Sequence, residues 1–141
     1  LAEAVTAYRD ALTVCTRDAM PANWAMTMTN LANALCTEGE RTGGEEGLTL
    51  LAEAVTAYRD ALTVRTRDAM PADWAATMNN LASAYESLAD LGANPRDNLQ
   101  AAETALRDTL TVYTREHMPY YHEKAVRALD RVRQKLAALD G

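Results

Sequence analysis

The sequence predicts an all-α fold, a solenoid built from antiparallel helix pairs with six helices in total. Two observations predict it. The segment 1–40 returns almost unchanged at 51–90, and the string LAEAVTAYRDALTV is identical in both copies. A third, more divergent copy follows, in which TVYTREHMP at 111–119 corresponds to TVRTRDAMP at 63–71. The repeat period of about 50 residues falls in the range of stacked-repeat proteins, and apolar residues in each copy recur at the spacing of a helix face.

Composition narrows the class of protein. A chain of 141 residues with 48% hydrophobic content can form a real core, and its net charge of −6 argues against nucleic-acid binding. No apolar run approaches the roughly 18 residues of a membrane span, so we expect no membrane partner. Cys15 and Cys36 do not fill corresponding places in the repeats, which favours a reducing, cytoplasmic compartment over a disulfide framework. Because Leu1 opens within a repeat, we expect a fragment of a larger protein.

Each repeat contains two helical segments, which we term helix B and helix A in chain order. In helix B of the second repeat, Leu51, Ala54 and Tyr58 share one face. Pro71 ends that helix and suits the first turn of helix A, whose apolar face begins at Trp74. The same pattern in all repeats predicts helices at 1–18, 21–37, 48–69, 71–88, 95–117 and 119–139. The units are approximately 1–47, 48–94 and 95–141, within a single array.

Two linkers return the chain from helix A to helix B. The segment 37–47 is rich in glycine and acidic residues, which favours a mobile loop. In the second linker, Gly92 is the expected helix stop, Asn94 the expected cap and Pro95 the first residue of the next helix.

The two ends of the array differ from its middle. The last helix, 119–139, has His122, Asp130 and Arg133 where the preceding helix A has Trp, Ala and Tyr. It keeps one apolar stripe, which is typical of a capping helix that closes an array against water. The first helix has no preceding helix A, so part of its apolar face is expected to be open, covered by further sequence or by a second chain.

The chain resembles the tetratricopeptide repeat (TPR). Asn80-Leu-Ala-Ser-Ala-Tyr85 is similar to the helix A motif of that family, and Ala54, Tyr58, Ala61 and Leu62 are similar to its helix B motif. The long repeat resembles a bacterial tandem variant found beside CHAT-type peptidase domains or signalling ATPases. The resemblance implies a noncatalytic protein–protein interaction scaffold whose inner wall is formed by the A helices.

The sequence contains no pattern typical of a catalytic or metal site. His117 and His122 are five residues apart, which does not place both imidazoles on one helix face. Neither cysteine has an evident histidine partner, and the glutamates of 38–46 follow no calcium-loop pattern. We therefore expect no enzyme, no metal and no cofactor.

The candidate site is the wall formed by the A helices. A ladder of amides there could hydrogen-bond the backbone of an extended peptide. Its predicted residues are Asn30, Asn33, Asn79, Asn80 and Ser83. Alternatively, Asn30 and Asn80 join neighbouring helices, since buried amides need partners.

A basic stripe on the last helix extends this wall. Lys124, Arg127 and Arg131 are spaced to share one face and could bind an acidic side chain or a terminal carboxylate. The alternative is a solvated capping surface with ordinary helix pairs such as Glu123 with Arg127.

Three functions remain open on sequence alone. The leading prediction is a scaffold that binds a protein or an extended peptide on the helix A wall. The second is a self-association module that forms a homodimer or stacks head to tail through its open terminal helices. The third, a small-molecule sensor, is weaker because Trp24 and Trp74 are needed to fill the space between repeats.

Overall fold

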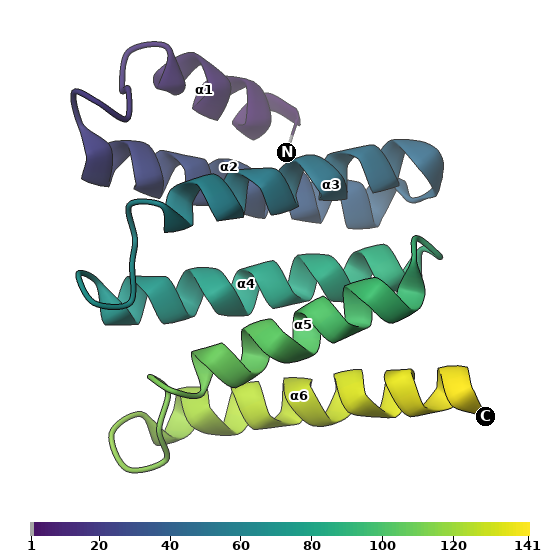
Figure 1. Ribbon diagram of the computed structural model, residues 1–141. Coiled ribbons are helices and arrows are strands. Elements are labelled where there is room, and N and C mark those ends of the chain that lie inside the picture. The colour runs from purple at the N-terminus through teal and green to yellow at the C-terminus, as the bar shows by residue number, and fades with distance from the viewer. Residues whose placement is uncertain (1) are drawn as a thin grey trace.

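The computed structural model describes residues 2–141, which form six α-helices and no strand (Figure 1). The helices are α1 (Ala2–Leu12), α2 (Pro21–Thr42), α3 (Gly44–Leu62), α4 (Pro71–Asp90), α5 (Pro95–Thr109) and α6 (Pro119–Asp140). The predicted all-α class is confirmed. Leu1, where the first helix was expected to begin, lies outside the described residues. Within residues 2–141, no helix combines the length and apolarity required to cross a membrane.

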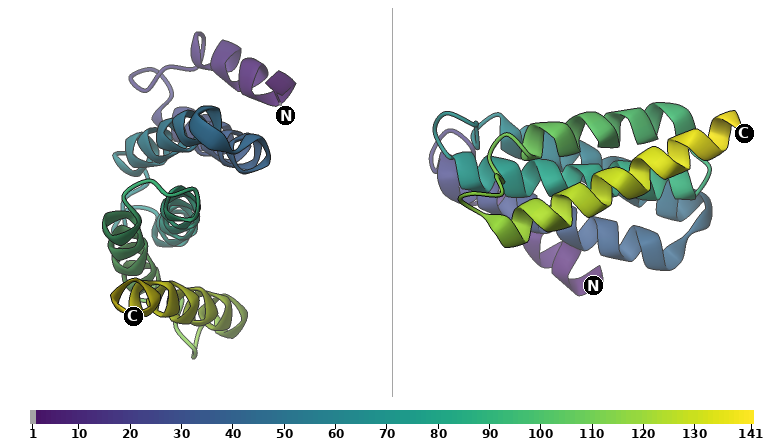
Figure 2. Two further views of the ribbon diagram at one scale, coloured as in Figure 1. Left: turned by 90° about the vertical axis from the view of Figure 1, so that its right-hand side faces the viewer. Right: turned by 90° about the horizontal axis from the view of Figure 1, so that it is seen from below.

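The helices follow one another from one end of the molecule to the other (Figure 1). Each helix packs mainly on its neighbours in the chain, with α2 against α3 and α4 against α5 forming the most extensive contacts. The core runs through the whole stack, and Leu35, Leu51 and Leu106 are among its fully buried residues. In Figure 1 and in the left view of Figure 2, α1 and α6 lie at opposite ends, so each has a helix neighbour on one side only.

Proline sets the start of four helices. Pro21, Pro71, Pro95 and Pro119 each occupy the first position of a helix, where the missing N–H has no intrahelical partner to lose. The three A helices therefore begin where the sequence predicts.

The B helices end earlier than predicted. The third helix ends at Leu62 instead of residue 69, because a threonine turn follows it. Thr63 Oγ1 donates to the carbonyl of Asp60 at 2.6 Å, and Thr66 Oγ1 accepts from the N–H of Ala69 at 3.2 Å. The same two bonds recur after α1 and after α5, so the ends predicted at residues 18 and 117 lie instead at Leu12 and Thr109.

The prediction of a mobile loop at 37–47 is wrong. Helix α2 continues to Thr42, and Gly43, with φ of 65°, is the single residue between it and α3. Gly39 and Gly47 allow close helix packing. A Cβ on Gly39 would lie 2.9 Å from Leu51 Cγ, and a Cβ on Gly47 would lie 2.6 Å from the carbonyl oxygen of Gly39. The glycine signal here indicates a tight crossing between two helices and not mobility.

The second linker is partly as predicted. Gly92 follows the end of α4 with φ of 90°, as a helix stop does. Asn94, however, makes no side-chain cap. It adopts a left-handed conformation with φ of 38°, and Asn98 Nδ2 donates to the carbonyl of Ala93 at 2.7 Å.

Candidate functional site

Two shallow pockets that share one lining residue follow the A helices. The first, about 300 Å³, is lined by Asn33, Cys36, Thr37, Glu40, Tyr58, Asn80 and Ser83. The second, about 230 Å³, is lined by Ala76, Asn79, Asn80, Tyr113, Tyr121 and Lys124. Asn80 lines both pockets, so the two pockets lie next to each other. We refer to these residues together as the polar groove.

The middle of the polar groove is held by a hydrogen-bond junction. Asn33 Oδ1 on α2 accepts from the Tyr58 hydroxyl on α3 and, at 3.3 Å, from Asn80 Nδ2 on α4. This junction joins three helices, as the alternative reading of Asn80 predicts. Asn79 has no such link to another helix among the residues that the structure describes, and its amide lines the groove. The amides of Asn33 and Asn80 thus join neighbouring helices, whereas that of Asn79 remains on the groove.

One end of the polar groove is acidic. Glu40 is exposed, and its carboxylate accepts from Ser87 Oγ at 3.1 Å. Beside it, burial raises the pKa of the Cys36 thiol to about 11, so the thiol is uncharged near neutrality and is a poor nucleophile. Burial likewise raises the pKa of Tyr58, which stays a hydrogen-bond donor.

The other end is aromatic and basic. Tyr113 stacks on Tyr121 with ring centroids 5.1 Å apart, and Tyr121 meets Tyr120 edge to face at 5.4 Å. Lys124 Nζ lies 5.3 Å from the centre of the Tyr120 ring. Burial, followed by the neighbouring Tyr121 and Asp73, raises the pKa of Tyr113. This end therefore presents stacked rings beside one ammonium group.

The structure separates the three residues of the predicted basic stripe. Only Lys124 lines the polar groove. Arg127 lines a different pocket and pairs with Glu123 at 2.5 Å. Arg131 makes two hydrogen bonds to Glu86 on α4, at 2.7 and 2.8 Å. An acidic ligand in the groove would therefore meet one cation and not three.

Glu86 is the centre of the ion pairs that join α6 to α4. Its carboxylate is bound by Arg131 and, at 2.7 Å, by Lys135, which also contacts Asp90 at 2.9 Å. Burial alone would raise the pKa of Glu86, but the hydrogen bonds from Arg131 and Lys135 outweigh burial and hold its pKa below the ordinary value. These charged side chains pair with one another and help to position α6 on α4.

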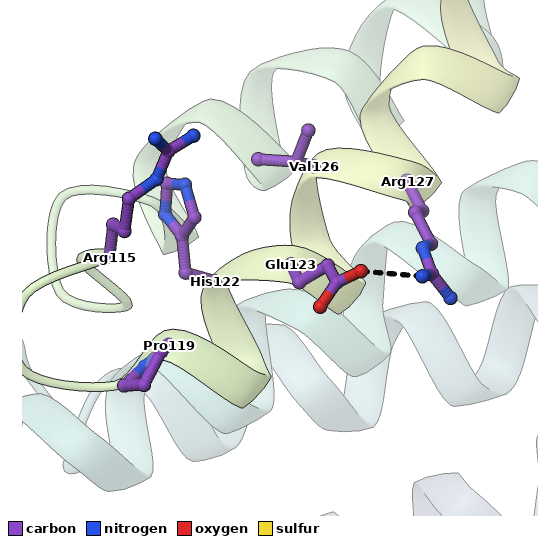
Figure 3. A pocket seen from close by; sticks show the side chains of 6 residues that line it. All are labelled: Arg115, Pro119, His122, Glu123, Val126 and Arg127. Atoms are coloured by element: carbon purple, nitrogen blue, oxygen red, sulfur yellow. Dashed lines mark hydrogen bonds and ion pairs between the residues drawn. The ribbon is translucent and has the colours of Figure 1, made fainter.

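A further pocket lies outside the polar groove, at the start of α6. It has a volume of about 480 Å³ and is lined by Arg115, Pro119, His122, Glu123, Val126 and Arg127. Figure 3 shows the Arg115 side chain beside the His122 ring, with Glu123 turned toward Arg127. We refer to it as the end pocket.

Sequence reasoning placed some groove residues correctly on the A helices and missed others. Asn30 lies on α2 but lines neither of the two groove pockets. Tyr58 and Tyr113 were missed because they come from α3 and from the loop after α5. The place of Tyr113 in the repeat holds Cys15 and Arg65 in the earlier copies, so the repeat pattern gives no signal for this buried tyrosine.

The polar groove offers hydrogen bonding and stacking. Its amides, hydroxyls and rings suit an extended polar ligand, and in residues 2–141 no three His, Cys, Asp or Glu side chains converge as metal ligands. Comparisons with protein-family models, curated proteins and solved structures find no match to this chain.

Proposed function

We propose that this chain is a solenoid of antiparallel helix pairs of the TPR type, and that it serves as a noncatalytic scaffold that binds an extended peptide in the polar groove. The repeated helix A and helix B sequences support the architecture, as does the packing of each helix on its chain neighbours. The observation that carries the function is the pair of adjacent pockets that share Asn80 and are lined by residues of three successive A helices.

The proposed ligand is an extended peptide with an acidic group at one end. Asn79 and Asn80 provide amides that can pair with a peptide backbone. Lys124 at the aromatic end attracts a carboxylate, whereas Glu40 at the opposite end repels one. The charge difference along the groove therefore sets the direction in which such a peptide lies.

The test is a titration of isotope-labelled protein with a library of extended acidic peptides, followed by NMR. We expect the amide signals of Asn79, Asn80 and Lys124 to shift, with an affinity that falls as salt is added. Lys124→Glu should weaken binding at least about tenfold, which corresponds to about 1.4 kcal/mol.

Arg127→Glu is the matched control, because it makes the same charge change on the same helix but lies in the end pocket. It should leave peptide affinity within about twofold. Equal loss in both variants, or shifts confined to residues outside the polar groove, would contradict the proposal.

A further inference from the structure

We propose that a second copy of this chain docks head to tail on α6, so that the array of repeats continues from one molecule into the next. The polar groove takes no part in this contact. The inference rests on a polar contact that recurs between consecutive repeats, on an ion pair between the first two B helices, and on the matching groups that the two ends of the chain present.

The first contact joins an arginine before a helix A to the threonine turn of the next repeat. Arg17 Nε donates to Thr63 Oγ1 at 3.3 Å. One repeat later, Arg67 Nε donates to Thr111 Oγ1 at 3.1 Å. Each arginine also stacks on the tryptophan ring of its own repeat. The chain therefore contains two examples of the same link between repeats.

The ends of the molecule carry the two halves of a third such link. Arg115 fills the arginine position and lies beside His122 in the end pocket (Figure 3). Thr13 fills the threonine position in the turn after α1. The next residue, Val14, is 80% exposed, whereas the corresponding valines of the later repeats are half-buried. The end pocket, at about 480 Å³, has room for a valine side chain.

The second contact is an ion pair between the first two B helices, which occurs once within residues 2–141. Arg9 of α1 pairs with Glu53 of α3. The equivalent step beyond α5 would bring Arg107 of one copy to Glu3 of the next copy. Both side chains are exposed, and neither enters an ion pair among the residues that the structure describes. Arg107 and Glu3 therefore have opposite charges at the positions that a continued array would bring together. This charge complementarity favours a second copy of the chain as the partner that docks on α6.

The sequence of α6 makes this docking reversible. Asp130 and Arg133 stand where α4 has Ala82 and Tyr85, so the C-terminal half of α6 cannot accept an apolar helix as α4 does. The contact is therefore centred on the end pocket. A symmetric pairing of two α1 helices would use the same exposed residues of α1 but would leave the end pocket untouched.

Sedimentation equilibrium over a wide concentration range, with reducing agent, tests the proposal. We expect the average mass to rise above the 15.4 kDa of one chain as concentration increases. Val14→Glu and Val126→Glu should each remain at 15.4 kDa alone, because each variant keeps only one functional end. An equimolar mixture should form a one-to-one pair. Thr104→Glu, which adds the same charge at an exposed position of α5, is the control and should associate like the parent chain.

Charge reversal provides a second test that leaves the core unchanged. Glu3→Arg or Arg107→Glu alone should weaken association, and the double variant should restore it. A parent chain that stays at 15.4 kDa at all concentrations would overturn the proposal. So would normal association of Val126→Glu, which would indicate pairing through α1 alone, or the absence of pairing in the mixture.

Discussion

Helices α1 and α3 have the same sequence over LAEAVTAYRDALTV, yet their side chains have different environments. In α3, Tyr58 is 2% exposed and Ala61 is 0% exposed. Their counterparts in α1 are half-buried Tyr8 and exposed Ala11. The difference arises because α3 packs between α2 and α4, whereas α1 packs mainly on α2. The repeated sequence therefore carries two contact faces, and the neighbours decide which of them is buried.

The largest expected effect is a difference in stability between variants of Tyr58 and Tyr8. Tyr58→Ala should lower the free energy of unfolding by about 3 to 5 kcal/mol, because it empties a buried site and removes the hydrogen bond to Asn33. Tyr8→Ala, the same change in the same local sequence, should cost about 1 kcal/mol. Urea unfolding followed by circular dichroism measures both values. Equal costs would show that burial does not distinguish the two helices.

The next expected effect concerns the close crossing of α2 and α3, for which α1 has no counterpart. Gly47→Ala should destabilise the protein by about 1 to 3 kcal/mol, because the new Cβ would lie 2.6 Å from the backbone oxygen of Gly39. The better helix propensity of alanine offsets only part of this cost. Thr49→Ala, at an exposed position of the same helix, is the matched control in the same urea experiment. A stabilised Gly47→Ala variant would show that the two helices do not pack this closely.

At the opposite end of the stack, ion pairs join α6 to α4 in addition to apolar packing, and the stabilisation that these ion pairs provide depends on pH. Glu86→Gln should cost about 1 to 2 kcal/mol at pH 7, because it removes the anion between Arg131 and Lys135. The pKa of Glu86 is lower in the folded protein, so its stabilisation is complete above the unfolded pKa of about 4.3 and is lost as pH falls through the folded pKa.

Urea unfolding of the parent chain and the variant at several pH values measures this prediction. The two stabilities should converge in acid. Glu123→Gln removes an exposed carboxylate paired with Arg127 and should change stability by less than about 0.5 kcal/mol. A difference between parent and Glu86→Gln that persists unchanged in acid would contradict the role of the carboxylate charge.

Much of the fold could be predicted from the sequence, because repetition and proline are strong local signals. Pro21, Pro71 and Pro119 fixed the helix A starts. The helix B ends could not be read from periodicity, because the side-chain hydrogen bonds of Thr63 and its equivalents end the helix within an otherwise helical pattern. The role of Gly47 was misread because close approach and mobility favour the same residue.

The candidate site could be predicted only in part. The sequence placed Asn79, Asn80 and Lys124 on one wall, and the structure brings them together in one pocket. It could not show that Arg131 is engaged by Glu86, since these residues belong to different repeats and meet only through the packing of α6 on the stack. Contacts across repeats require the three-dimensional arrangement.

Amide hydrogen exchange, measured by NMR at a concentration where the chain is monomeric, tests most directly whether neighbours alone distinguish α1 from α3. The two helices share their sequence, so their intrinsic exchange rates are the same, and any difference in protection is structural. We expect the amides of 57–61 to exchange at least about tenfold more slowly than those of 7–11, a difference of about 1.4 kcal/mol. Equal protection in the two segments would contradict this explanation.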